Sequence, residues 1–313
     1  IMKYIILMLA LLLSSCSEGV TGEISDSNIN SGIPIYKKDN VVYYCEIKDG
    51  IYSIVAENNK LSNITTLEPN SGVTALFADD EYLYYTLVVP KNVSVFRISL
   101  DGGETEELFT HELTNTLRND YIYASGNTVY YFIPNDGLWE ITDGDTELIS
   151  EGAKDCVIAD NTIYYSEDRN VYSKSIDTGD ERTLITKKEI FESGQNDQLL
   201  LQTLGDGYVD NMLLYKNKLY FLVTDGYSGG IFCMDLDGKN FECVDPEYRV
   251  YKFMFDQNGD MYMSGVNFNT QDKGLFKVSD NIELICDYKI SDFYINNGCY
   301  YYKVNDGAFA YIK

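Results

Sequence analysis

A chain of 313 residues is long enough for one large all-β domain or for two smaller domains, and internal repeats have to decide between them. Hydrophobic residues make up 45% of the chain and include 28 Tyr and 14 Phe, which is enough for an extensive core and argues against general disorder. The formal net charge of −25 repels the phosphates of nucleic acids, so we expect no nucleic-acid partner.

The amino terminus has the order of a secretory signal. Lys3 supplies a positive charge, an apolar run follows at 5–13, and the tetrapeptide Leu13-Ser14-Ser15-Cys16 comes at once. The run is too short to span a bilayer, which takes about 20 residues. The tetrapeptide resembles a bacterial lipobox, and the resemblance implies that Cys16 gains a diacylglyceryl group after which residues 1–15 are removed. The alternative is an ordinary cleaved signal with a chance cysteine.

A lipid on Cys16 would hold the protein on the extracytoplasmic face of the cell membrane. Residues 16–33 are rich in Ser, Asn, Gly and acidic residues, and this composition predicts a flexible tether behind the lipidated cysteine. The repeats begin after the tether, and we assign residues 34–313 to a single domain.

Seven segments of this domain share one pattern in which a Tyr stands at the centre of an apolar and aromatic triplet. Successive central Tyr residues are 34 to 56 positions apart, compared with about 40 to 50 for a four-stranded propeller blade. The central residues are Tyr43, Tyr84, Tyr130, Tyr164, Tyr220, Tyr262 and Tyr300. Each triplet is followed by an apolar residue and an aromatic residue, the latter being Tyr52, Phe96, Trp139, Tyr172, Phe232, Phe276 and Phe309.

Turn residues divide each repeat into short strands. Asn or Gly precedes most of the triplets, and Asp-Gly turns such as Asp49-Gly50 and Asp136-Gly137 follow several of them. One repeat is therefore four antiparallel strands whose sheet is apolar on both faces, and radial stacking covers both. We predict an all-β β-propeller of four-stranded antiparallel blades, with seven blades and six as the alternative. The seventh repeat stops after three strands, and the recurring aromatic residues are packing residues.

The fifth repeat carries a family resemblance. Residues 218–244, KLYFLVTDGYSGGIFCMDLDGKNFECV, resemble the YWTD-type propeller unit of low-density-lipoprotein-receptor relatives and the bacterial domain of unknown function DUF5050, which is found on exported proteins. The triplet Leu219-Tyr220-Phe221 replaces the Tyr-Trp-Thr-Asp core of that unit. The resemblance implies a propeller, and because those families have six blades it is the source of the alternative blade number. It supplies no catalytic or ligand-binding residue.

Cysteine and histidine usage limits the chemistry. Apart from Cys16 there are six cysteines without a CxxC motif, and His111 is the one histidine, so we expect no zinc site, no other metal and no cofactor. His111 is predicted to lie just after an outer strand, away from the axis, which argues against a histidine base. We predict no catalytic residue. Cys233 and Cys243 fall on neighbouring predicted strands, and whether they pair stays open.

Two long loops on adjacent repeats, 224–230 and 264–273, are the candidates for ligand binding. Each carries an aromatic residue and an acidic one, and the four candidates are Asp225, Tyr227, Phe268 and Asp272. The structural alternative is ordinary turn chemistry, because Asp and Gly favour turns. A polar insertion at 186–206, with helical character at 187–191, is the other irregularity, and its role stays open.

These observations favour a monomeric, membrane-tethered extracytoplasmic lipoprotein. Its propeller would act as a binding or assembly module for an unknown envelope protein, peptide or glycan. The alternative is a carboxylate-dependent polysaccharide-active enzyme, because Asp and Glu are abundant and two of them can form an acid and base pair.

Overall fold

The computed structural model describes the greater part of the chain after the predicted tether. The described residues are 35–38, 41–48, 51–56, 59–64, 72–89, 91–113, 120–133, 136–159, 161–193, 207–224, 229–256, 258–279, 282–287, 290–296, 299–304 and 309–312. They fall into two compact units, one within Gly32–Glu151 and the other within Gly152–Lys313. No described helix has the length and apolar character needed to traverse a bilayer.

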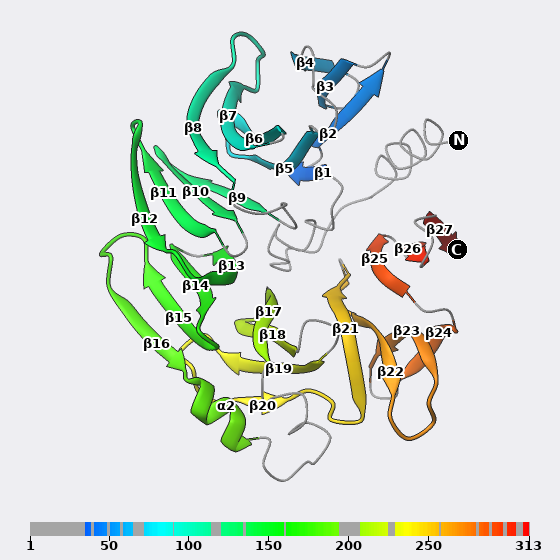
Figure 1. Ribbon diagram of the computed structural model, residues 1–313. Coiled ribbons are helices and arrows are strands. Elements are labelled where there is room, and N and C mark those ends of the chain that lie inside the picture. Colours follow the sequence, from blue (N-terminus) through cyan, green and yellow to red (C-terminus); the bar gives the residue numbers. More distant parts are fainter. Residues whose placement is uncertain are drawn as a thin grey trace. The chain divides into compact units, whose positions relative to one another are not determined.

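The first unit contains three four-stranded antiparallel sheets (Figure 1). The first sheet is β1 (Ile35–Lys38), β2 (Val41–Lys48), β3 (Ile51–Ala56) and β4 (Asn59–Ile64). The second is β5 (Gly72–Ala78), β6 (Tyr82–Val89), β7 (Asn92–Ser99) and β8 (Glu106–Glu112). The third is β9 (Tyr121–Ser125), β10 (Thr128–Ile133), β11 (Gly137–Thr142) and β12 (Asp145–Ser150). Strands pair in chain order, and β5 packs against both β1 and β9.

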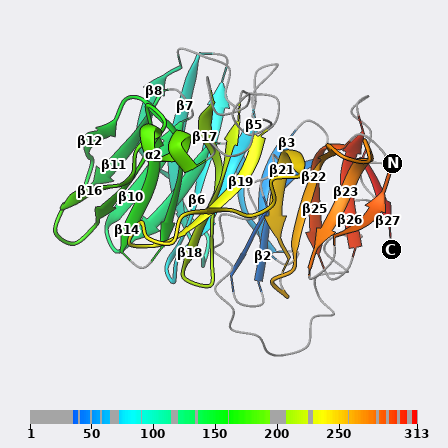
Figure 2. The same cartoon turned by 90° about the horizontal axis from the view of Figure 1, so that it is seen from below.

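The sheets of the second unit are also antiparallel, with strands that pair in chain order (Figures 1 and 2). Its first sheet is β13 (Ala153–Ala159), β14 (Thr162–Glu167), β15 (Asn170–Ser175) and β16 (Glu181–Ile185). Two further meanders follow, β17 (Tyr208–Tyr215), β18 (Lys218–Thr224), β19 (Gly229–Asp235) and β20 (Glu242–Cys243), then β21 (Tyr248–Phe255), β22 (Met261–Asn267), β23 (Lys273–Val278) and β24 (Glu283–Cys286). The pair Gly229 and Val250 joins these two meanders into one eight-stranded sheet.

The last described sheet has three strands, β25 (Ile290–Asn296), β26 (Cys299–Val304) and β27 (Phe309–Ile312). Three strands are also what the sequence predicts for the seventh repeat. The first strands again lie side by side, with β17 against β13 and β21, and β21 against β25. The assignment of both units to one domain and the number of blades stay predictions.

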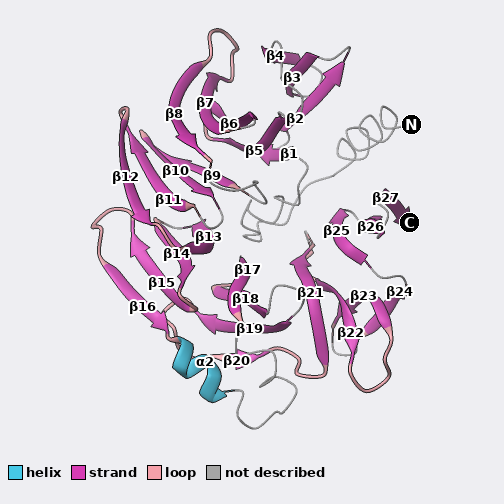
Figure 3. Ribbon diagram, viewed as in Figure 1, coloured by secondary structure: helices cyan, strands magenta, loops and turns pink. Residues whose placement is uncertain are grey.

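A short helix follows β16 (Figure 3). The helix α2 (Lys187–Ser193) begins after Thr186, whose backbone N donates to Glu189 Oε2 at 2.8 Å. The backbone N of Glu189 donates in return to Thr186 Oγ1 at 3.3 Å. This reciprocal arrangement is a capping box, which satisfies backbone N–H groups that the first helical turn leaves free. The helical character predicted at 187–191 is confirmed.

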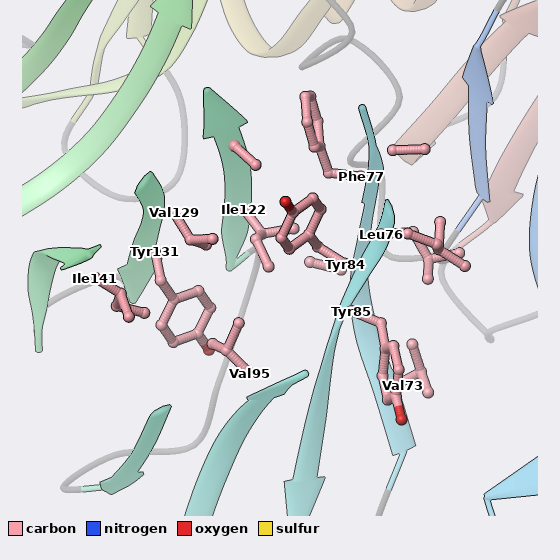
Figure 4. Packing of buried hydrophobic residues seen from close by; sticks show 14 of the residues in the cluster. Val73, Leu76, Phe77, Tyr84, Tyr85, Val95, Ile122, Val129, Tyr131 and Ile141 are labelled. Carbon is pink, nitrogen blue, oxygen red and sulfur yellow. The ribbon is translucent and has the colours of Figure 1, made fainter. Parts of the chain in front are cut away.

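The recurring Tyr residues pack in the sheet interiors, as predicted. Where side chains are described, the central Tyr is buried in four repeats and half-buried at Tyr220. In the first unit, Tyr84, Tyr85 and Tyr131 lie in one core with aliphatic residues of the sheets β5–β8 and β9–β12 (Figure 4). The following aromatic residue completes the packing, because the ring of Phe96 stacks on that of Tyr85 at a centroid distance of 5.3 Å.

A bulge interrupts the first strand of five sheet repeats. The register with the second strand shifts between Val73 and Leu76, Ala153 and Asp155, Asp210 and Leu213, Val250 and Lys252, and Ile290 and Asp292. A bulge bends its strand and redirects a side chain out of the regular alternation. Polar residues of the first strands therefore take positions that the apolar pattern of the sequence does not indicate.

Candidate functional site

The predicted loop site is described only in part. Cys16, Asp225 and Tyr227 lie outside the described residues. Phe268 is half-buried and Asp272 is exposed in the turn between β22 and β23. Thr270 Oγ1 donates to Asp272 Oδ2 at 2.6 Å, and the Asp272 carbonyl accepts from the Asn267 backbone N at 2.9 Å. The turn thus uses the polar groups of Asp272 internally, and a ligand-binding role for the four loop residues stays a prediction.

His111 is not placed as predicted. It lies within β8 and not beyond it, because pairing with β7 continues to Asn92 and Glu112. Its ring packs between Phe109 and Trp139, at centroid distances of 6.0 and 5.1 Å, and its Nε2 is 3.3 Å from Asp136 Oδ2. Trp139 belongs to β11 of the neighbouring sheet, so the imidazole is part of the packing between two sheets of the first unit.

Cys233 and Cys243 are free thiols. In the pairing of β19 with β20, Cys233 stands opposite Glu242 and Cys243 stands opposite Phe232, so the two sulfur atoms are not directly opposed. Burial, and secondarily a hydrogen bond to Glu242, raises the pKa of Cys233 to about 11, against the lowering effect of Lys218. At neutral pH this side chain is a protonated thiol, which is a poor nucleophile.

A group of titratable side chains lies at the bulges of the second unit. Asp155 of β13, Asp210 of β17 and Lys252 of β21 come from three first strands that are neighbours, and all three are half-buried. Asp155 Oδ1 accepts from the Cys156 backbone N at 2.8 Å. The two carboxyl groups belong to first strands of the sheet repeats, β13 and β17. The apolar pattern of those strands predicts only core residues there.

One hydrogen bond repeats from sheet to sheet in this row. Asp155 Oδ2 accepts from the Met212 backbone N at 2.6 Å, across from β13 to β17. Asn211 Oδ1 accepts from the Phe253 backbone N at 3.2 Å, across from β17 to β21. Asp155 and Asn211 each stand two residues before the residue that faces the central Tyr of their own repeat. A side chain at the same position of the repeat therefore joins β13 to β17 and β17 to β21.

The two carboxyl groups influence each other. Burial, and then the nearby charge of Asp210, raises the pKa of Asp155 well above its usual range, although backbone N–H groups led by that of Met212 oppose the shift. Burial also raises the pKa of Asp210, while the Asn211 N–H and the charge of Lys252 lower it. This pair can therefore retain a proton at a pH at which isolated aspartates are ionised.

Sequence reasoning missed this row. A signal for it exists in the two first strands AKDCVIA and YVDNMLLY, where two adjacent polar residues, Lys-Asp in one and Asp-Asn in the other, interrupt the apolar run at the same place in the repeat. Within the described part of the chain, no group of three or more His, Cys, Asp or Glu side chains could hold a metal ion. The contacts that the row makes are hydrogen bonds to backbone N–H groups.

Neither a protein-family model nor a curated protein matches this sequence. Solved structures do match. YCF48 bound to D1 peptide aligns with 87% of this chain and 90% of its own, at a TM-score of 0.52 and 8% identity. Oligogalacturonate lyase in complex with manganese aligns with 89% of this chain and 84% of its own, at 0.50 and 8% identity.

A third similar structure is the extracellular domain of the putative one component system BT4673 from B. thetaiotaomicron. It aligns with 90% of this chain and 40% of its own, at a TM-score of 0.50 and 12% identity. Together with the antiparallel meanders, these likenesses establish the architecture. The chain is a β-propeller. They show the fold alone, and the narrower resemblance to DUF5050 and YWTD-type propellers stays a prediction.

Proposed function

We propose that the chain is a membrane-tethered extracytoplasmic lipoprotein whose propeller acts as a binding or assembly module for an envelope protein, peptide or glycan. The observation that carries the proposal is the row of half-buried polar side chains at the bulges of β13, β17 and β21. In a propeller the blades surround a central channel, and first strands border it. We expect a ligand of the propeller to contact polar groups of these strands.

The chemistry of the row supports a polar ligand. Asp155, Asp210 and Asn211 present carboxyl and amide groups, and Lys252 adds a cation. The net charge of −25 attracts partners with cationic groups and repels anionic partners. One of the similar structures is described as bound to a peptide and another as an extracellular domain, which is consistent with such a role.

The predicted lipid on Cys16 supports a location at the membrane surface. The order of charge, apolar run and lipobox-like tetrapeptide at the amino terminus predicts a lipid on Cys16, and a lipidated cysteine retains the domain at the membrane surface. The expected partners are therefore molecules of the envelope, and the predicted loop residues Asp225, Tyr227, Phe268 and Asp272 remain candidates for contact with them.

The test is a glycan array together with a peptide and envelope-protein binding screen, using the full chain in detergent. We expect at least one ligand whose binding weakens tenfold or more in Asp210→Asn or Lys252→Met. The exposed carboxyl variant Asp237→Asn is the matched control and should bind as the wild type does. No binding in either screen would contradict the proposal. So would a ligand whose binding is unchanged by substitutions in the row and in the loop residues.

A second candidate is a carboxylate-dependent polysaccharide-active enzyme. The specific observation in its favour is the pair Asp155 and Asp210, because burial raises the pKa of both carboxyl groups and a general acid needs a carboxyl group with a raised pKa. The measurement is the release of new reducing ends or unsaturated products from bacterial and plant polysaccharides. Turnover that disappears in Asp155→Asn and in Asp210→Asn would establish the enzyme, and no turnover by the wild type would eliminate it.

A further inference from the structure

His111 and Asp136 face each other where two sheets of the first unit meet. His111 lies in β8, the last strand of the sheet β5–β8, and Asp136 lies in the turn between β10 and β11 of the sheet β9–β12. The imidazole Nε2 is 3.3 Å from Asp136 Oδ2, and only 22% of the His111 side chain and 10% of the Asp136 side chain are exposed. The two side chains therefore join the sheets at a place that is largely shielded from water.

Aromatic rings hold the imidazole in front of the carboxyl group. The His111 ring stacks on Phe109 of its own strand, with an interplanar angle of 9°, and packs against Trp139 of β11. Phe109 and Trp139 are themselves 5.4 Å apart between ring centroids, so the three rings form one cluster across the junction. Because the face of an aromatic ring attracts a cation, this cluster can accommodate a charged imidazole.

The contact between the two side chains depends on the charge of the imidazole. In the described packing, His111 Nε2 is buried and forms no hydrogen bond, although the carboxylate oxygen is 3.3 Å away. A buried nitrogen without a hydrogen bond is unfavourable. Protonation gives the ring a positive charge, which the nearby carboxylate attracts strongly where water screens poorly. Acidification therefore converts a weak contact into an ion pair.

Other ionisable groups lie on or beside the elements that surround this contact. They are Lys91, Arg97, Glu106, Glu107, Glu112, Asp120, Tyr131 and Glu140. The glutamates next to His111 and Trp139 in their strands point to the opposite faces, because side chains alternate along a strand. Arg97 pairs with Glu106 at 2.7 Å, and Tyr131 donates to Asp120 Oδ2 at 3.1 Å. Asp136 is the charged group that the structure places against the imidazole.

We propose that His111 and Asp136 form a pH-dependent clasp between the sheets β5–β8 and β9–β12. The clasp is closed when the protonated imidazole pairs with the carboxylate, and it loosens when the imidazole is neutral. Because His111 is the one histidine of the chain, no second imidazole duplicates this response. The clasp is separate from ligand binding and does not depend on the proposed function.

The direction of the pH effect follows from these charges. Histidine changes its charge at about pH 6.5 in ordinary surroundings. The ion pair forms only in the native protein, so it stabilises the folded state at pH values below that range, and this stabilisation is lost as the pH rises through it. A single ionisable group changes the folding equilibrium constant by at most about tenfold for each pH unit.

The first experiment uses the fluorescence of Trp139, the one Trp of the chain, whose ring centroid is 5.1 Å from that of His111. A protonated imidazole in contact with an indole quenches its emission, and a neutral imidazole does so much less. We expect the emission of the folded full chain to fall between about pH 8 and about pH 5.5. His111→Gln should remove this fall, and Asp136→Asn should move it to lower pH, because the carboxylate no longer favours the charged ring.

Glu112→Gln is the matched control for this titration. It removes an exposed carboxyl group one residue from His111 on the opposite face of β8, and it should keep the wild-type curve. Emission of the wild type that does not change with pH would overturn the clasp. So would an Asp136→Asn curve identical to that of the wild type.

The second experiment measures the unfolding equilibrium of the wild type, His111→Gln, Asp136→Asn and the double variant. The cycle removes the general effect of pH on this acidic protein, because all four chains share it. We expect the coupling between the two positions to be about tenfold in the folding equilibrium constant at about pH 5.5 and less than about twofold at about pH 8.5. Equal coupling at both pH values, or a larger one at the higher pH, would overturn the clasp. The fluorescence of the wild type decides the question if a variant fails to fold.

Discussion

Replacement of Thr86 by Val tests the polar bridge that joins two sheets of the first unit. Thr86 Oγ1 accepts from the Ala75 backbone N at 2.8 Å and donates to Asp120 Oδ2 at 2.9 Å, and the residue is fully buried. Tyr131, from β10 of the next sheet, donates to the same oxygen at 3.1 Å. Val has nearly the shape of Thr, so the substitution removes hydrogen bonds and leaves the packing in place.

The expected cost can be worked out from these contacts. An unsatisfied buried N–H at Ala75 costs about 1 to 3 kcal/mol, and the lost hydrogen bond to the Asp120 carboxyl costs about 1.5 to 3 kcal/mol. Thr86→Val should therefore lower the free energy of unfolding by about 3 to 5 kcal/mol. Thr86→Ser keeps the hydroxyl, loses one methyl group and should cost about 1 kcal/mol.

The assay is equilibrium denaturation of both variants, with Tyr131→Phe and the double variant Thr86→Val/Tyr131→Phe to complete a cycle. Because both hydroxyls serve one oxygen of Asp120, their effects should be non-additive by at least about 0.5 kcal/mol. A Thr86→Val variant within about 1 kcal/mol of Thr86→Ser would refute the reasoning, since the hydroxyl would then carry none of the stability assigned to it.

Two further predictions concern close packing and thiol chemistry. A Cβ at Gly274 would collide with the carbonyl oxygen of Cys286 across β23 and β24, so Gly274→Ala should destabilise the protein by about 1 to 3 kcal/mol in thermal denaturation. Gly144→Ala meets no neighbouring atom and should cost only about 1 kcal/mol for its positive φ, so an equal loss in the two variants would contradict the packing argument. Because the pKa of Cys233 is about 11, iodoacetamide at pH 8 should leave this thiol unmodified in the native protein and modify it in denaturant. Mass mapping checks this, and equal labelling in the two states would show that the thiol is not protected.

The repeats of the sequence predict most of the described fold. A Tyr at the centre of each triplet and an aromatic residue after it require sheets that are covered on both faces, and the structure buries Tyr84, Tyr130, Tyr164 and Tyr262 as that pattern demands. The three-stranded final sheet and the helix at 187–193 also follow from local pattern. These features depend on residues that are close in sequence, and their periodicity is visible without the structure.

The candidate site could not be predicted in the same way. A β-bulge adds one residue to a strand and leaves no reliable trace in an apolar pattern, so the sequence shows an Asp in each of two strands but not that Asp155 and Asp210 lie where β13 meets β17. The hydrogen bond from the Met212 backbone N to Asp155 joins two residues that are 57 positions apart in the chain, so no local pattern indicates it. His111 was misplaced for a related reason, because pairing between β7 and β8 extends further than the turn residues indicate.

The measurement that bears most directly on the proposed cellular role is intact mass spectrometry of the mature protein from the membrane fraction of a bacterium that expresses the full chain. The proposal predicts a mature chain that begins at Cys16 and carries a diacylglyceryl group, and it predicts that Cys16→Ser abolishes this modification and releases the protein from the membrane. A mature chain that begins elsewhere, or an unmodified Cys16 on a protein that is still membrane-bound, would contradict the proposal.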